Sequence, residues 1–200
     1  MQIVLASRNA HKIAELRRMA PAVHWVPMPD TLPDPPETGD SFEDNAIEKA
    51  RFVAQATGMM ALADDSGLEV DALGGAPGVH SRRYSAEATD AGNNARLLAE
   101  LDRLAREAGE RGERPPLRTA RYRCVLALVH GDTVRTVAGV CEGRIGWEAR
   151  GDGGFGYDPL FWPDEVPGRA MAELAPSEKD AISHRGAAVA QLDALLAGLS

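Results

Sequence analysis

Two adjacent aspartates, Asp64 and Asp65, follow the apolar run at residues 59–63, which is typical of a buried strand. Neighbouring side chains of a strand point to opposite faces, so at most one of the two can be a ligand in any one site. A carboxylate at a strand end suits Mg²⁺, which takes oxygen ligands from one or two carboxylates and from substrate phosphates. Glu37, at the end of a proline-rich loop, is the candidate second carboxylate. The alternative is an Asp-Ser-Gly turn that only caps a loop.

A group of cations stands where the first helix is expected to begin, at residues 10–19. Asn9 is a suitable N-cap, and Arg8, His11 and Lys12 surround the positive end of the helix dipole. That placement is unfavourable unless an anion lies there, and free backbone N–H groups with a lysine are what phosphate oxygens need. The alternative is a set of solvated surface cations.

The last helix repeats this pattern if it begins after Ser183, in the segment SHRG at residues 183–186. A start at Ser177, with Asp180 completing a capping box, is an equal alternative. The earlier start would place Gly186 inside the helix at a cost of about 1 kcal/mol, which favours the later one. Lys179 stands upstream of the cationic segment.

The segment GDGGFG at residues 151–156 matches a dinucleotide fingerprint by accident. That fingerprint needs a helix directly after it, whereas Pro159 disfavours helical geometry at Asp158. A glycine-rich loop of this kind can instead hold a flat base. Phe155 could stack on the base and Asp158 could accept a ring N–H.

The element pattern predicts a mixed α/β sheet flanked by helices. Expected strands are residues 2–6, 23–26, 59–63, 68–72, 119–129 and 133–141, and expected helices are 10–19, 42–56, 89–108 and a C-terminal helix ending near 199. Strands and helices alternate early, while Gly131-Asp132 predicts a hairpin late. The five prolines in residues 27–37 predict an extended loop. With 200 residues and no repeat, we expect a single domain over residues 1–200.

Composition narrows the class of function. The chain is 44% hydrophobic, has no apolar run long enough to span a membrane, and carries a formal charge of −8. We expect a soluble cytoplasmic protein that does not bind duplex nucleic acid, which usually needs a basic face. An anionic ligand would then need specific local cations. Cys124 and Cys141 have no metal-ligand spacing and are expected to be buried thiols.

Five blocks occur in the order of one known family: SRNAHKIAEL, ETGDSFEDNAIEKA, ADDSGLEVDALGGAPGVHSRRY, GGFGYDPLF and AELAPSEKDAISHRG. With them the chain resembles the inosine triphosphate pyrophosphatase family from residue 2 to about residue 196. The resemblance implies a twisted sheet in two lobes with an active-site cleft between them, and a homodimer. It implies Mg²⁺-dependent cleavage of ITP, dITP and XTP to the monophosphate and pyrophosphate.

The resemblance also implies roles for residues. Asp65 is expected to be the metal ligand and proton acceptor, and Glu37 a second acidic partner of the metal. Expected substrate contacts are Ser7, Arg8, Asn9, Ala10, His11, Lys12 and Ser66 for the triphosphate side, and Phe155, Gly156, Tyr157, Asp158, Lys179, His184 and Arg185 for the base. The family often has glycine where this chain has Arg8, which leaves the shape of that loop open.

Three other functions share parts of this pattern. A pyrophosphatase for modified pyrimidine triphosphates should lack the SHR segment at residues 183–185. A phosphatase would release single phosphates, and a nucleotide sensor would bind without turnover. The 6-oxo group of hypoxanthine or xanthine can accept a hydrogen bond from a donor such as Lys179 or Arg185, whereas the 6-amino group of adenine cannot. The sequence does not show how guanine is excluded.

Overall fold

The computed structural model describes residues 2–199 and contains a six-stranded mixed sheet with the strand order β2-β1-β3-β4-β5-β6. β1 is parallel to β2 and β3, and β6 is antiparallel to β5. The strands are β1 Gln2–Leu5, β2 His24–Pro27, β3 Ala61–Val70, β4 Thr119–His130, β5 Thr133–Ile145 and β6 Phe161–Pro163. The α-helices are α1 Ala10–Met19, α2 Phe42–Thr57, α3 Asp90–Glu110, α4 Pro176–Ile182, α5 His184–Val189 and α6 Leu192–Leu196. The predicted mixed α/β sheet is therefore confirmed.

Capping side chains explain why the long helices begin where the sequence predicts. Asn9 accepts hydrogen bonds from two backbone N–H groups of α1, and Ser41 and Thr89 each accept one at the start of α2 and α3. α2 ends at Gly58, whose φ of 66° suits a residue without a side chain. These local signals act within a few residues, so they can be read from sequence.

The predicted break after residue 63 is wrong. Residues 61–70 form one continuous strand, and Asp64 and Asp65 lie in its middle, both buried. The alternative Asp-Ser-Gly turn is therefore wrong as well. A strand can carry two adjacent carboxylates through a buried region only when cations meet both faces, and the structure supplies them.

The single C-terminal helix is also a wrong prediction, because the segment forms three short helices, α4, α5 and α6. Of the two alternative starts, the one at Ser183 is confirmed, whereas Ser177 lies inside α4 and does not cap it. α4 begins at Pro176, where a proline at the first helical position loses no hydrogen bond, and α5 begins after Ser183, whose hydroxyl accepts from the Gly186 N–H. Gly186 lies inside α5.

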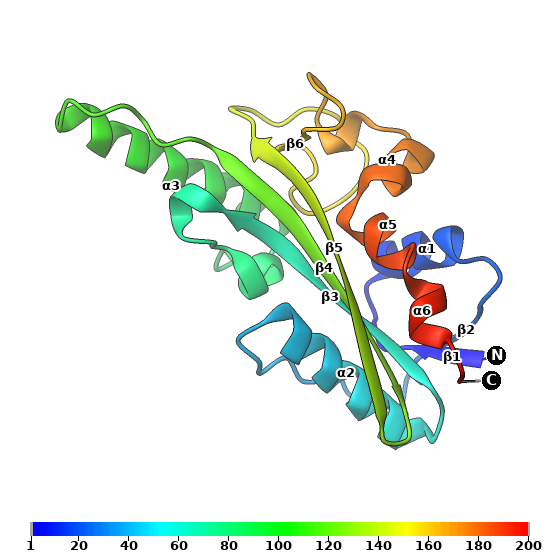
Figure 1. Cartoon of the computed structure of the whole chain (residues 1–200). Helices are drawn as coiled ribbons and strands as arrows, with labels where there is room; N and C mark the ends of the chain where they lie inside the picture. Colours follow the sequence, from blue (N-terminus) through cyan, green and yellow to red (C-terminus); the bar gives the residue numbers. More distant parts are fainter. Residues whose placement is uncertain (1, 200) are drawn as a thin grey trace. The chain divides into compact units, whose positions relative to one another are not determined.

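The described chain divides into two compact units. Unit 1 comprises residues up to 66, 124–140 and from 183 onward, and unit 2 comprises residues 67–123 and 141–182. In unit 1, α2 lies on one face of the strands and α1, α5 and α6 lie on the other (Figure 1). The core on the latter side includes Ile3, Leu5, Leu16, Leu62, Leu126 and Leu195. The predicted cleft between two lobes stays a prediction.

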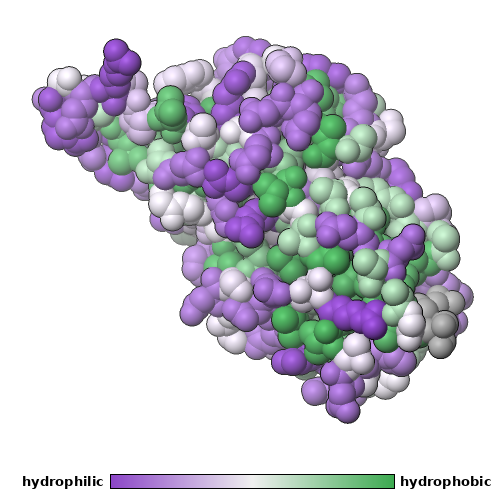
Figure 2. Space-filling view, in the orientation of Figure 1, coloured by the Kyte–Doolittle hydropathy of each residue, from purple (hydrophilic) through white to green (hydrophobic). Residues whose placement is uncertain are grey.

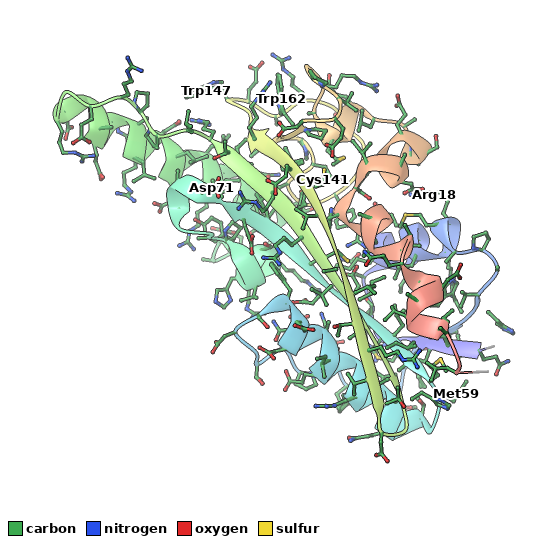
Figure 3. The ribbon with its side chains drawn as sticks, in the orientation of Figure 1. Arg18, Met59, Asp71, Cys141, Trp147 and Trp162 are labelled. Atoms are coloured by element: carbon green, nitrogen blue, oxygen red, sulfur yellow. The ribbon has the colours of Figure 1, made fainter. Side chains whose placement is uncertain are left out.

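Unit 2 has its own core, which includes Leu68, Leu97, Leu101, Tyr122 and Phe161. The C-terminal end of α3 and the loop after it are covered with hydrophilic residues (Figure 2). Trp147 and Trp162 lie near β6 (Figure 3), and the Arg118 guanidinium stacks 3.6 Å from the exposed Trp147 ring. Within residues 2–199, no helix has the length and apolar character needed to cross a membrane.

Gly139 in β5 sets how closely α5 approaches the sheet. A Cβ at this position would lie 2.1 Å from the His184 carbonyl oxygen and 2.5 Å from the Ala188 nitrogen, both backbone atoms that cannot rotate away. We therefore expect Gly139→Ala to lower the free energy of unfolding by about 1–3 kcal/mol. Gly109→Ala, in α3 with nothing near its Cβ, is the control and should be neutral or add up to about 1 kcal/mol. Urea denaturation measures both, and equal values for the two variants would contradict the close approach.

Candidate active site

Strand β3 turns its two central carboxylates toward different partners. Asp64 contacts Lys12 of α1 and Arg185 of α5, whereas Asp65 contacts Lys49 of α2. The predicted alternation is therefore confirmed. The Lys12 Nζ lies 2.5 Å from Asp64 Oδ1, so the cationic helix start is adjacent to the aspartate pair, as the sequence predicts.

Asp64 is enclosed by hydrogen-bond donors. Its Oδ1 accepts from the Ser66 hydroxyl at 2.9 Å, and its Oδ2 accepts from Arg185 Nε at 2.8 Å and from the Cys124 thiol at 3.1 Å. Its side chain is fully inaccessible to solvent. A carboxylate with this many donors is fixed in place and has no room for a metal ion.

Arg185 is the centre of a buried ion-pair network in unit 1. Its guanidinium contacts Asp64, the Ser66 hydroxyl and the Glu15 carboxylate, and the residue is 1% exposed. Arg185 holds Asp64 and Glu15, and Ser66 bridges Arg185 and Asp64. The predicted contacts of Arg185 with the base and of Ser66 with the substrate stay predictions.

The electrostatics of Asp64 follow from these partners. Burial alone would raise its pKa, but the charges of Arg185 and Lys12 outweigh burial and hold the pKa well below the ordinary value of 3.8. Asp64 is therefore ionised throughout the physiological range. Its role is to hold two cations in position.

The pKa of Asp65 is shifted in the opposite direction. Burial raises its pKa, and the neighbouring Lys49 only partly offsets this effect. Asp65 Oδ1 accepts from the Lys49 ammonium at 2.7 Å, while the buried Asp65 Oδ2 has no hydrogen-bond partner among residues 2–199. A buried carboxylate with a raised pKa and one open oxygen is suited to accept a proton.

Lys49 is a functional residue that the sequence analysis missed. Its ammonium donates to Glu37 Oε1 at 2.9 Å, to Asp65 Oδ1 at 2.7 Å and to the Asp64 carbonyl oxygen at 2.9 Å. Burial would lower its pKa, but Asp65 and Glu37 raise it overall, so Lys49 stays charged. A signal was present, because a lysine at position 49 falls on the apolar stripe of α2.

The two predicted metal ligands, Glu37 and Asp65, are brought together around Lys49. They offer carboxylate oxygens, one of them unbonded, and the Asp64 carbonyl lies beside them. This all-oxygen set fits Mg²⁺, which needs few protein carboxylates when a substrate supplies phosphate oxygens. Over the described residues, no group of three or more acidic, histidine or cysteine side chains is arranged to hold a metal. Any metal held here would depend on ligands from outside the chain.

The start of α1 has part of the arrangement that the predicted phosphate-binding turn needs. Asn9 caps the helix by accepting from the N–H groups of His11 and Lys12, so those two groups are already bonded. Arg8 turns away and pairs with Asp34 at 2.9 Å and with carbonyl oxygens of the proline-rich loop. The structure therefore gives Arg8 a loop-fixing role and leaves Lys12 as the cation beside the aspartates.

The glycine-rich loop in unit 2 is built around Asp158, which is 2% exposed. Asp158 Oδ2 accepts from the Phe155 N–H at 2.9 Å and from the Lys179 ammonium at 2.6 Å. The Lys179 Nζ lies 4.6 Å from the centre of the Phe155 ring, within cation–π range. Gly154 is required here, because a Cβ would lie 2.1 Å from Asp158 Oδ2. Three predicted base-binding residues are therefore one connected group.

The other predicted base contacts, Gly156, Tyr157 and His184, are not part of this connected group. Tyr157 is buried and its hydroxyl donates to the Ser81 carbonyl at 2.8 Å, while the Gly156 N–H donates to Asp90 at 2.7 Å. Both residues hold the loop in shape. His184 is buried at the start of α5, in unit 1, whereas Lys179 belongs to unit 2.

Comparison with known proteins agrees with this architecture over the whole chain. Residues 3–195 match the Ham1 family. The chain is 47% identical to a dITP/XTP pyrophosphatase of Anaeromyxobacter sp. strain Fw109-5, covering 100% of this chain and 98% of the relative. It is also 47% identical to the dITP/XTP pyrophosphatase of Methylococcus capsulatus, again covering 100% and 98%.

Solved structures of proteins with these names are also similar to this chain. A HAM1 protein from Coxiella burnetii is similar with a TM-score of 0.84 and 44% identity, over 98% of each chain. A nucleoside-triphosphatase, dITP/XTP pyrophosphatase from Mycobacterium abscessus is similar with a TM-score of 0.73 and 43% identity, over 98% of this chain and 100% of the other.

The buried network around Asp64 makes a prediction about stability. Asp64→Asn removes the carboxylate that Lys12 and Arg185 share and leaves Glu15 as the carboxylate beside Arg185, so we expect a loss of about 3–5 kcal/mol in the free energy of unfolding at pH 7. Asp71→Asn, which alters the partly exposed ion pair of Asp71 with Arg121, is the control and should cost about 0–1 kcal/mol.

The lowered pKa of Asp64 also predicts how the stability difference between wild type and Asp64→Asn changes with pH. Because folding lowers the pKa of Asp64, its carboxylate stabilises the fold fully above its unfolded pKa, and this stabilisation is lost as pH falls through the native pKa. The gap between wild type and Asp64→Asn should therefore be constant between about pH 8 and pH 5 and shrink below about pH 4. A gap that grows on acidification in urea titrations would contradict the assignment.

Proposed function

Because the chain belongs to the Ham1 family, we propose that it hydrolyses non-standard purine nucleoside triphosphates, namely ITP, dITP and XTP, to the monophosphate and pyrophosphate. It is accordingly a hydrolase that acts on phosphoric anhydrides. The structural observation that carries the proposal is the cationic start of α1, whose Lys12 is paired to Asp64 next to the proton-accepting Asp65.

The polyphosphate end of the substrate is assigned to unit 1. Lys12 is partly accessible, its ammonium is held by Asp64, and it stands at the positive end of the α1 dipole. In this position it stabilises negative charge on a departing pyrophosphate. Asp64 contributes by fixing the ammonium, so it is a positioning residue.

Asp65 is proposed to accept the proton of the attacking water. The raised pKa of Asp65 makes it a stronger base than an ordinary aspartate, and its open Oδ2 provides a place for the proton. Attack at the α-phosphorus, in line with the departing pyrophosphate, releases the monophosphate. Glu37 and Asp65 would hold Mg²⁺, which when bound neutralises charge on the triphosphate.

The base is assigned to Phe155, Asp158 and Lys179. The Phe155 ring offers an apolar face for stacking, and the ion pair with Asp158 fixes the Lys179 ammonium over that ring. Lys179 then donates to the 6-oxo group, whereas the 6-amino group of adenine is itself a donor and forfeits this hydrogen bond at a cost of about 1–3 kcal/mol. Arg185 is not needed for this discrimination.

A substrate panel tests the proposed reaction. ITP, dITP, XTP, ATP and GTP are each incubated with the protein, with and without Mg²⁺, and the products are separated by ion-exchange chromatography. We expect monophosphate and pyrophosphate from the first three in the presence of Mg²⁺ and far less turnover of ATP. Release of orthophosphate and a nucleoside diphosphate would refute the proposal. The homodimer that the resemblance implies is a separate proposal, which sedimentation equilibrium tests.

Asp65→Asn tests the general base. We expect kcat with ITP to fall by about 100- to 10,000-fold, because an amide cannot accept the proton, while the Kd for ITP measured without Mg²⁺ changes little. Asp71→Asn is the matched control, since Asp71 lies at the end of β3 (Figure 3) and is outside the assigned site. Steady-state kinetics and equilibrium dialysis measure the two quantities. Wild-type kcat in Asp65→Asn would remove Asp65 from this role.

A further inference from the structure

The Lys49 ammonium in unit 1 is surrounded by oxygens of the kind that a divalent ion binds. Three oxygens surround its ammonium: Glu37 Oε1, Asp65 Oδ1 and the Asp64 carbonyl, at 2.7–2.9 Å. Lys49 is 6% exposed, so the ammonium is also shielded from water. These are the same carboxylates that fit Mg²⁺.

A second observation shows that the ammonium satisfies this group only in part. Asp65 is 7% exposed, and its Oδ2 is buried without a hydrogen-bond partner among residues 2–199. An unbonded carboxylate oxygen in a buried position is costly, and buried polar atoms normally find a partner. An oxygen in this state beside two other oxygen donors indicates a ligand other than the lysine.

We propose that Lys49 is an internal counter-cation that competes with the divalent ion for Asp65 and Glu37, so that the metal binds tightly only together with a polyphosphate. This proposal rests on the proposed function and deepens it. An ammonium and a divalent ion that share the same two carboxylates repel each other. Two carboxylate charges cannot balance the three positive charges of both cations. The negative charges of a triphosphate can.

The position of Lys49 affects how well a metal ion can bind when no nucleotide is present. Without a nucleotide, the Lys49 ammonium offsets the charge of one of the two carboxylates and lowers the cost of burying the group. With a nucleotide, the substrate's oxygens supply both the missing metal ligands and a new partner for the displaced ammonium. Metal affinity is thus linked to substrate, and by reciprocity substrate affinity is linked to metal.

Binding of Mn²⁺ alone tests the proposal without any turnover. Mn²⁺ prefers the same oxygen ligands as Mg²⁺, and its free concentration is read from its electron paramagnetic resonance signal. Lys49→Met should bind Mn²⁺ about tenfold more tightly than wild type, a change of about 1.4 kcal/mol. Lys12→Met is the matched control, because it removes one charge near the pair but leaves Lys49 in place. The gain in Mn²⁺ affinity of Lys12→Met should be clearly smaller than that of Lys49→Met.

Two results would overturn the proposal: a Lys49→Met affinity equal to or weaker than that of wild type, or equal gains for both variants, which would indicate a general charge effect. If Lys49→Met does not fold, wild-type thermal unfolding still decides. Pyrophosphate with Mn²⁺ should raise the Tm beyond pyrophosphate alone, while Mn²⁺ alone should leave it unchanged. An equal rise with Mn²⁺ alone would contradict competition. The substrate panel reports on the reaction separately, so failure of either proposal is distinguishable from failure of the other.

Discussion

The structure depends on two adjacent carboxylates that are buried on opposite faces of one strand. Burying a charge is tolerated only when a partner compensates it, so β3 needs a separate set of cations on each side. α1 and α5 bring Lys12 and Arg185 to Asp64, and α2 brings Lys49 to Asp65. The helices of unit 1 are thus fixed by electrostatics as well as by their apolar contacts. Removing any one of these charges therefore changes the charge balance around its buried partners.

The same alternation gives the two aspartates different chemistry. Asp64 is saturated with donors and permanently ionised, so it can only hold other groups in place. Asp65 has one cation, one open oxygen and a raised pKa, so it can exchange a proton or accept a metal. Two neighbouring residues of the same type therefore differ in what they can do: Asp64 is fixed by its donors, and Asp65 has an oxygen that is open to a ligand or a proton. The division comes from their surroundings and not from their intrinsic properties.

Much of the fold could be predicted from sequence because its signals are local. Asn9, Ser41 and Gly58 mark helix ends by hydrogen bonds or backbone angles within a few residues. The errors have a different origin. The continuous strand through Asp64 and Asp65 depends on cations distant in sequence, such as Arg185. No local pattern shows that these charges meet.

In the candidate site, too, the residues with a local sequence signal could be predicted and those that depend on distant contacts could not. Lys12, Glu37 and the pair Asp64 and Asp65 could be predicted as a group from residue chemistry, whereas the choice of Asp65 over Asp64 came from resemblance alone. Lys49 and Glu15 were missed, because a charged residue on a helix is usually solvated, and only tertiary packing shows that these two are buried. The contact of Arg185 with a base was expected from resemblance and stays a prediction, and its guanidinium is held by buried ion pairs.

In the proposed reaction, water attacks the α-phosphorus of the triphosphate and pyrophosphate departs. Hydrolysis of ITP in water enriched in oxygen-18, followed by mass spectrometry of both products, tests it most directly. Attack at the α-phosphorus places the heavy oxygen in the inosine monophosphate and leaves the pyrophosphate unlabelled. Heavy oxygen in the pyrophosphate, with an unlabelled monophosphate, would show attack at the β-phosphorus and contradict the account.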